Sequence, residues 1–146
     1  MATIPRYTAT GNVAADTGTT MAPTLTTAAA DYTGISANNL LCFTANATNG
    51  SRIVGLKFTA LGTNTQSVAR IYTNNGAVNT SAGNNSLVGS LTLPGTTASN
   101  TVAEPAATYY FENGSLDLDP AFRIYVGLAT TVAAGWRVTP IGGGEF

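Results

Sequence analysis

Hydrophobic and polar residues alternate along much of the chain with a period of two, which is typical of β-strands. The clearest runs are residues 52–60, 68–73, 87–93, 122–128 and 136–141, and shorter candidates are residues 40–45, 108–111 and 116–118. Successive side chains of a strand point to opposite faces, so each run has one apolar face. The pattern predicts antiparallel sheets that pack these faces about 10 Å apart in a β-sandwich.

The same alternation predicts which side chains face the core. Val54, Leu56 and Phe58 fall on one face of their run, and Leu87 shares a face with Leu91 and Leu93. The later runs place Phe122, Ile124, Val126 and Leu128 on one face, and Trp136 and Val138 on another. If Phe58, Ile124 and Trp136 are core residues, each truncation to alanine costs about 3–5 kcal/mol.

Turn-forming residues separate these runs. Asn-Gly at Asn75 and Gly76 follows a predicted strand, and residues 74–85 are too long for a minimal hairpin, so we expect a protruding loop there. Helix signals are almost absent, apart from a weak one for a single turn in residues 23–31. Residues 1–39 are rich in Thr, Ala and Gly, and we predict an extended N-terminal arm that becomes ordered against a partner. Residues 40–146 form the predicted sandwich domain.

The composition indicates a protein that assembles with other protein copies rather than a free monomer. The chain has 146 residues, of which 44% are hydrophobic and only 9% charged, with a net charge of −1; about 25% is usual for charged residues. A surface of hydroxyl, amide and methyl groups repels neighbouring copies weakly. The cations are scattered singly, so we expect no nucleic-acid partner. The N-terminus lacks a signal-peptide pattern and no apolar run approaches a membrane span, so we expect synthesis in the cytoplasm and no membrane partner.

The residues needed for most catalysis are missing. The chain contains no histidine and a single cysteine, which excludes Ser–His–Asp and Cys–His catalysis and zinc sites built on histidine or several cysteines. Cys42 lies among Leu40, Leu41 and Phe43, and we predict that its thiol is buried. Asp117 and Asp119 share a face of a short strand; two solvated acids are favoured there over a weak calcium site or an acid–base pair. We therefore predict no enzyme activity, no cofactor and no metal.

Aromatic residues supply the candidates for partner contacts. Tyr109, Tyr110 and Phe111 are consecutive, so on a strand they alternate between faces and at least one is a core residue. An outward-facing tyrosine is suited to anchoring an interface, or to stacking on a sugar ring. The predicted partner contacts are Ile4, Arg6, Tyr7, Tyr109, Tyr110, Arg123 and Trp136.

Several segments carry a resemblance to known proteins. These are residues 62–65, 68–76, 79–85 and 91–94, followed by residues 122–130, 132–136 and 142–144. Over roughly residues 40–146 the chain resembles small virion structural proteins of tailed bacteriophages that act as head decoration or cement proteins. The resemblance implies a jelly-roll-like β-sandwich that binds the outside of an icosahedral shell, often as a trimer at three-fold positions.

Sequence and resemblance together lead to one expected function and two alternatives. We expect a capsid decoration protein on the phage head surface, a homotrimer whose partner is the major capsid protein and which stabilises contacts between capsomers. The first alternative is another virion component, such as a tail-fibre, baseplate or neck protein. The second is a carbohydrate-binding adhesion module that uses Tyr109, Tyr110 or Trp136.

Overall fold

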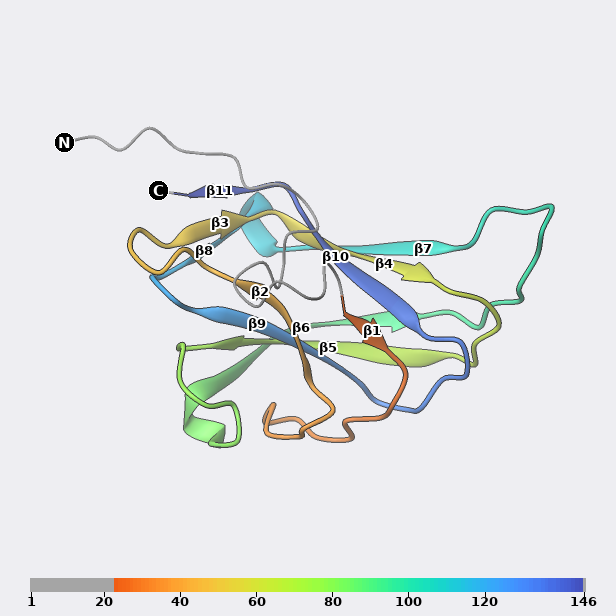
Figure 1. Cartoon of the computed structure of the whole chain (residues 1–146), viewed down its shortest axis with the longest axis horizontal. Coiled ribbons are helices and arrows are strands. Elements are labelled where there is room, and N and C mark those ends of the chain that lie inside the picture. Colours follow the sequence, from red (N-terminus) through yellow and green to blue (C-terminus); the bar gives the residue numbers. More distant parts are fainter. Residues whose placement is uncertain (1–22, 146) are drawn as a thin grey trace.

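The computed structural model describes residues 23–145, which form antiparallel sheets joined by loops (Figure 1). The first sheet has the order β1 (Thr24–Leu25), β10 (Trp136–Ile141), β4 (Gly55–Ala60) and β7 (Ala106–Tyr110). The second sheet has the order β2 (Leu40–Thr44), β9 (Arg123–Leu128), β5 (Ser67–Asn74) and β6 (Asn85–Leu93). A small third sheet has the order β11 (Gly144–Glu145), β3 (Ser51–Ile53) and β8 (Leu116–Leu118). Two short 3-10 helices, η2 (Ala82–Asn84) and η3 (Glu112–Gly114), lie in the loops.

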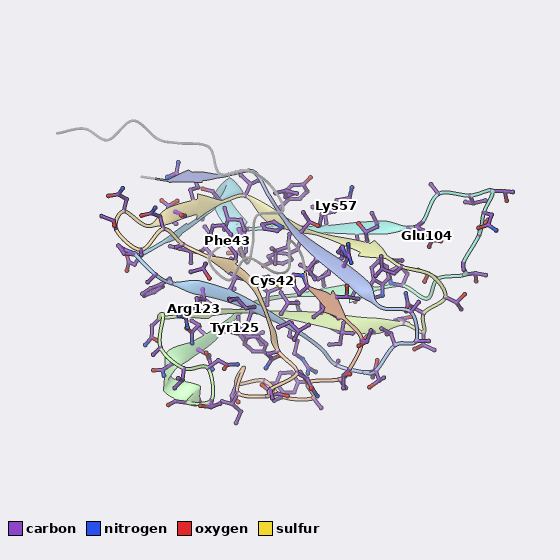
Figure 2. The ribbon with its side chains drawn as sticks, viewed as in Figure 1. Cys42, Phe43, Lys57, Glu104, Arg123 and Tyr125 are labelled. Atoms are coloured by element: carbon purple, nitrogen blue, oxygen red, sulfur yellow. The ribbon has the colours of Figure 1, made fainter. Side chains whose placement is uncertain are left out.

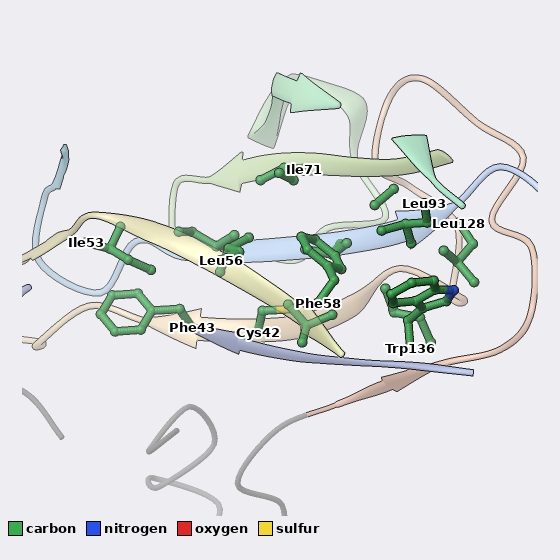
Figure 3. Packing of buried hydrophobic residues seen from close by; sticks show 14 of the residues in the cluster. Cys42, Phe43, Ile53, Leu56, Phe58, Ile71, Leu93, Leu128 and Trp136 are labelled. Atoms are coloured by element: carbon green, nitrogen blue, oxygen red, sulfur yellow. The ribbon is translucent and has the colours of Figure 1, made fainter. Parts of the chain in front are cut away.

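The first and second sheets pack face to face around one hydrophobic core, so the predicted all-β antiparallel sandwich is confirmed (Figure 3). Each sheet contributes alternate side chains. The first supplies Leu56, Phe58, Trp136 and Val138, and the second supplies Ala69, Ile71, Leu93, Ile124, Val126 and Leu128, all of them fully buried. The alternation in the sequence therefore identified most of this core.

Strand pairing within the two large sheets is nested along the chain. β1 pairs with β10, β2 with β9, β4 with β7 and β5 with β6. The adjacent pairs β10–β4 and β9–β5 join these into two sheets of four strands. The chain thus folds as one long ribbon of paired strands that is wrapped into a sandwich.

The third sheet continues the first, and the junction between them shifts the alternation. Val54 separates β3 from β4; its N–H donates to the carbonyl oxygen of Ile141 at 3.2 Å, and its own carbonyl accepts from the N–H of Phe111 at 3.1 Å. Ile53 and Leu56 are both fully buried, whereas Val54 is only half-buried. The prediction that Val54 shares the buried face of Leu56 and Phe58 was wrong because this extra residue moves the pattern by one position.

A β-bulge corrects a second detail. Ile71 pairs with Gly89 and Tyr72 pairs with Leu87, so Val88 has no partner in β5. The extra residue of a bulge shifts the in–out alternation by one position, so strict alternation no longer holds across it. Val88 therefore packs against the core, while Leu87 is 41% exposed and does not share the buried face of Leu93.

The predicted arm, residues 1–39, is described from residue 23 onward. Residues 24–25 form β1 rather than a helical turn, and Leu25 is 1% exposed within the core. Residues 26–39, which we call the cover loop, then cross the outer side of the second sheet before β2 begins (Figure 1). This portion of the predicted arm is thus packed on the sandwich itself.

Candidate functional site: the two outer faces of the sandwich

The cover loop starts along the edge of the second sheet, where its backbone pairs with β9 beyond the end of β2, and then crosses the outer face of the sheet. Ala28 forms a bridge with Leu128, and the N–H of Ala29 donates to the carbonyl oxygen of Leu128 at 2.8 Å. Gly127 leaves room for the loop: a Cβ there would lie 1.9 Å from the Asn39 side-chain oxygen and 2.8 Å from the Ala29 Cβ. The glycine therefore permits a close approach that any side chain would block.

Asp31 organises the loop through its carboxylate. The carboxylate accepts hydrogen bonds from the backbone N–H groups of Thr33, Gly34 and Ser36, and from the side-chain amide of Asn39 at 3.1 Å. Burial alone would raise the pKa of Asp31, but these donors outweigh it and hold the pKa below its ordinary value. The ionised form of Asp31 therefore stabilises the loop.

The backbone of Asp31 also binds the sheet beneath it. Its carbonyl oxygen accepts from the Tyr72 hydroxyl at 2.8 Å and from an Arg70 guanidinium nitrogen at 3.1 Å. The Arg70 guanidinium lies 3.9 Å from the ring centroid of Tyr32, a cation–π contact. Tyr72 is only 1% exposed although it lies on the outer face of β5, and burial, with a smaller contribution from Asp31, raises its pKa to about 12.

Asparagine side chains join the cover loop to the β5–β6 loop, residues 75–84. Asn85 donates to the carbonyl oxygen of Thr33 at 3.1 Å, and Asn79 donates to that of Gly34 at 3.4 Å. Asn74 and Asn85 are themselves hydrogen-bonded at 2.8 Å across the base of the loop. The predicted protruding loop is thus tied to the neighbouring segment by amide groups.

The outer face of the first sheet differs, because within residues 23–145 no loop is bonded over it. We call it the open face; it consists of Thr24, Lys57, Thr59, Ala106, Thr108, Tyr110, Arg137 and Thr139, which alternate with the buried residues of the same strands. Lys57 pairs with Thr108 on one side and Thr139 on the other, and Thr59 pairs with Ala106 and Arg137. The open face is therefore a regular array of hydroxyl groups that carries two cations and a tyrosine.

Neither cation on the open face has a partner among the described residues, in which Arg52 and Asp117 form the single salt bridge. Lys57 and Arg137 are both exposed and lie on diagonal positions of neighbouring strands, roughly 7–8 Å apart by sheet geometry. Figure 2 shows Lys57 projecting on the side of β4 and β7, whereas Arg123 and Tyr125 lie on the side of β9. Two like charges thus lie close together on this face.

The predicted tyrosine contacts separate into two environments. Tyr110 is 64% exposed on the open face. Tyr109 is half-buried; its ring meets that of Phe111 edge to face with centroids 5.4 Å apart, and its hydroxyl donates to the Val88 carbonyl oxygen at 3.2 Å. Tyr109 therefore links the edges of the two sheets, and Tyr110 is the residue of the pair that is available to a partner.

The other predicted contact residues are dispersed. Arg123 lies half-buried at the start of β9, where it donates to the Ala77 carbonyl oxygen at 3.4 Å. Trp136 has no exposed surface and its indole nitrogen has no hydrogen-bond partner within residues 23–145, so it is a core residue and the prediction of a partner contact is withdrawn for it. Ile4, Arg6 and Tyr7 lie outside the described residues.

The candidate chemical groups occupy structural positions. Cys42 is fully buried, and burial raises the pKa of its thiol far above the ordinary value, which keeps it protonated. Asp117 pairs with Arg52 at 2.6 Å, and the hydrogen bond to Arg52 lowers the pKa of this carboxyl group. Asp119 is exposed. Within residues 23–145 no group of three or more metal-ligating side chains is brought together, and no helix has the length and hydropathy of a membrane span.

Sequence reasoning did not identify Lys57 and Arg137 as a pair. Their outward orientation was readable from the alternation in residues 52–60 and 136–141, but their proximity depends on the pairing of β4 with β10. Comparison of the chain with protein-family models, with curated proteins and with solved structures found no match.

Proposed function

We propose that this protein is a virion structural protein, which decorates the outside of a tailed-phage head and stabilises contacts between capsomers. Its partner in this proposal is the major capsid protein, and its assembled form is a homotrimer located on the head surface. The proposal starts from the resemblance of residues 40–146 to head decoration proteins.

The strand order supports this class of protein. Among the eight strands of the two large sheets, the first pairs with the last, the second with the seventh, the third with the sixth and the fourth with the fifth. This nested pairing is the arrangement expected of an eight-stranded jelly roll, an architecture common in viral capsid and lectin domains. We therefore propose that the sandwich is a jelly roll.

The observation that carries the proposal is the character of the exposed surface. Only 9% of the residues are charged, and large apolar side chains are well exposed, with Tyr32, Val78 and Val102 each at 68–69%. Exposed apolar groups on a surface of few charges favour association with other protein surfaces. Many identical copies on a lattice would add avidity to each weak contact.

Binding to shells tests the proposal directly. Shells assembled from the major capsid protein alone are mixed with the full-length chain, and bound protein is measured by co-sedimentation and located by cryo-electron microscopy. We expect saturable binding to the outer surface and, for the free protein, a trimer mass by light scattering. Density on the tail or baseplate of the virion, or no binding to shells, would contradict the proposal.

A second candidate function is carbohydrate binding, and the exposed ring of Tyr110 favours it. Tyr110 is 64% exposed and lies beside the hydroxyl groups of the open face, and jelly rolls also serve as lectins. A glycan array with the wild-type chain and Tyr110→Ala separates the two functions. Binding to one glycan class that is lost in Tyr110→Ala supports adhesion; retained shell binding with no glycan signal supports decoration.

A further inference from the structure

We propose that the open face is the docking surface of this protein, and that it binds a carboxylate-bearing protein surface. The inference rests on the proposed function for the identity of the partner, which is the outer surface of the shell formed by the major capsid protein. It adds which face of the sandwich makes the contact and what chemistry the partner offers there.

The two outer faces of the sandwich differ in what covers them. The cover loop lies on the second sheet, where Asp31 and Asn39 meet Tyr72, Arg70 and Gly127. On the open face, Lys57, Ala106, Tyr110 and Arg137 remain exposed. A sheet face is held rigid by the pairing of its strands, so it loses little conformational entropy when a partner covers it.

The open face is positively charged. Lys57 and Arg137 occupy diagonal positions on β4 and β10, and within residues 23–145 the open face carries no acidic side chain. Glu104 lies before the start of β7 and forms no salt bridge with either cation, and Asp117 is already paired with Arg52. Neighbouring like charges repel each other on a sheet, whereas carboxylates on a partner would pair with both.

The residues around the two cations are of types that suit an interface. Tyr110 is next to Gly55 across the β4–β7 pair, and Thr59, Thr108 and Thr139 flank the two cations. Tyrosine and arginine are among the residues that most often dominate binding energy at protein interfaces. The threonine hydroxyls can donate to or accept from polar groups of the partner, so the whole face is suited to a polar interface with an aromatic anchor.

The test compares two double variants that change the net charge equally. Lys57→Gln with Arg137→Gln removes both cations from the open face, and Ser90→Glu with Thr92→Glu adds two acids on the opposite face, where both residues are exposed on β6. Binding to shells of the major capsid protein is titrated at several salt concentrations. We expect the affinity of the first variant to fall about tenfold or more, with a weaker salt dependence, while the second variant binds like the wild type.

A conservative variant separates charge from fold. Lys57→Arg with Arg137→Lys keeps both charges, and we expect it to retain binding. Circular dichroism should give the same thermal midpoint for all variants, because the substituted residues of both faces are exposed. Equal loss in both glutamine and glutamate variants would overturn the assignment of the face, as would wild-type binding by the glutamine variant. A further result would be that the wild type binds double-stranded DNA and not shells, with the same dependence on Lys57 and Arg137. That result would overturn the proposal that the partner is a protein.

The outcomes also distinguish this inference from the proposed function. If the wild type binds shells and the glutamine variant binds equally well, the proposed function stands and the docking face is wrong. If the wild type does not bind shells at all, the partner named here is wrong together with the proposed function.

Discussion

The two outer faces of the sandwich are built from strands of similar pattern, but one is covered by a loop of the same chain and the other is exposed. On the second sheet the cover loop buries Tyr72 to 1% exposure, whereas on the first sheet Tyr110 remains 64% exposed. The covered face has its polar groups bonded within the chain, through Asp31, Arg70 and Asn85. The open face keeps two cations without partners in the described part of the chain.

This difference separates a face that contributes to folding from a face that is left for binding. Residues of the covered face should be costly to change in the isolated protein, because their contacts are made within one chain. Residues of the open face should be nearly neutral for stability and costly only for partner binding. Substitutions matched between the two faces can therefore break or sharpen the distinction.

The largest difference is expected between the two tyrosines. Tyr72→Ala removes a buried ring and its hydrogen bond to the Asp31 carbonyl oxygen, and should lower the free energy of unfolding by about 3–5 kcal/mol. Tyr110→Ala should change it by less than about 0.5 kcal/mol. Urea unfolding followed by tryptophan fluorescence measures both; similar losses for the two variants would remove the distinction between the faces.

The next largest effect is expected at Asp31. Asp31→Ala leaves the N–H groups of Thr33, Gly34 and Ser36 without their acceptor and should cost about 2–3 kcal/mol, as for hydrogen bonds to a charged group. Asp119→Ala, which removes an exposed acid, is the matched control and should be close to neutral. A neutral result at Asp31 would mean that its carboxylate does not hold the cover loop.

A smaller loss is expected at Gly127, which tests the contact between the loop and β9. Gly127→Ala places a Cβ against the Asn39 side chain and the Ala29 Cβ, and such overpacking costs about 1–3 kcal/mol. Gly83→Ala is the control, because a Cβ there meets nothing within 4 Å. We expect faster hydrogen exchange in residues 26–39 of Gly127→Ala, and unchanged exchange would show that the loop is not seated on Gly127.

The smallest effect on stability is expected from lowering the pH. Because the pKa of Asp31 is held below its ordinary value in the folded protein, its contribution to stability is complete above the unfolded pKa and is lost as the pH falls through the folded pKa. Stability should therefore decline below about pH 4, and this decline should be shallower in Asp31→Ala. Asp117 has a lowered pKa as well, but its ion pair with Arg52 is exposed and contributes little. Identical acid profiles for wild type and Asp31→Ala would contradict this role.

Local alternation predicted the core where strands are regular and failed where pairing intervenes. Ile124, Val126 and Val138 were placed correctly because β9 and β10 keep a strict period of two. Val54 and Leu87 were misplaced, since a junction and a β-bulge depend on the partner strand. The two residues of β1 are too few to carry a period, so the start of the sandwich was hidden in the predicted arm.

The candidate surface was harder to predict than the core, for the same reason. Tyr110 was singled out from its aromatic neighbours, but the outward sides of Lys57 and Arg137 meet only when β4 and β10 pair. The burial of Tyr72 depends on a loop from a distant part of the chain. Periodicity describes one strand at a time, whereas a surface is made by several.

Amine footprinting of Lys57 tests the central claim most directly, because Lys57 is the only lysine in the chain. The free protein and the shell-bound protein are treated with an acetylating reagent, and modification of Lys57 is measured by mass spectrometry. The account predicts ready modification in free solution and strong protection on the shell. Equal modification of Lys57 in both states, with saturated binding, would contradict the assignment of the open face as the docking surface.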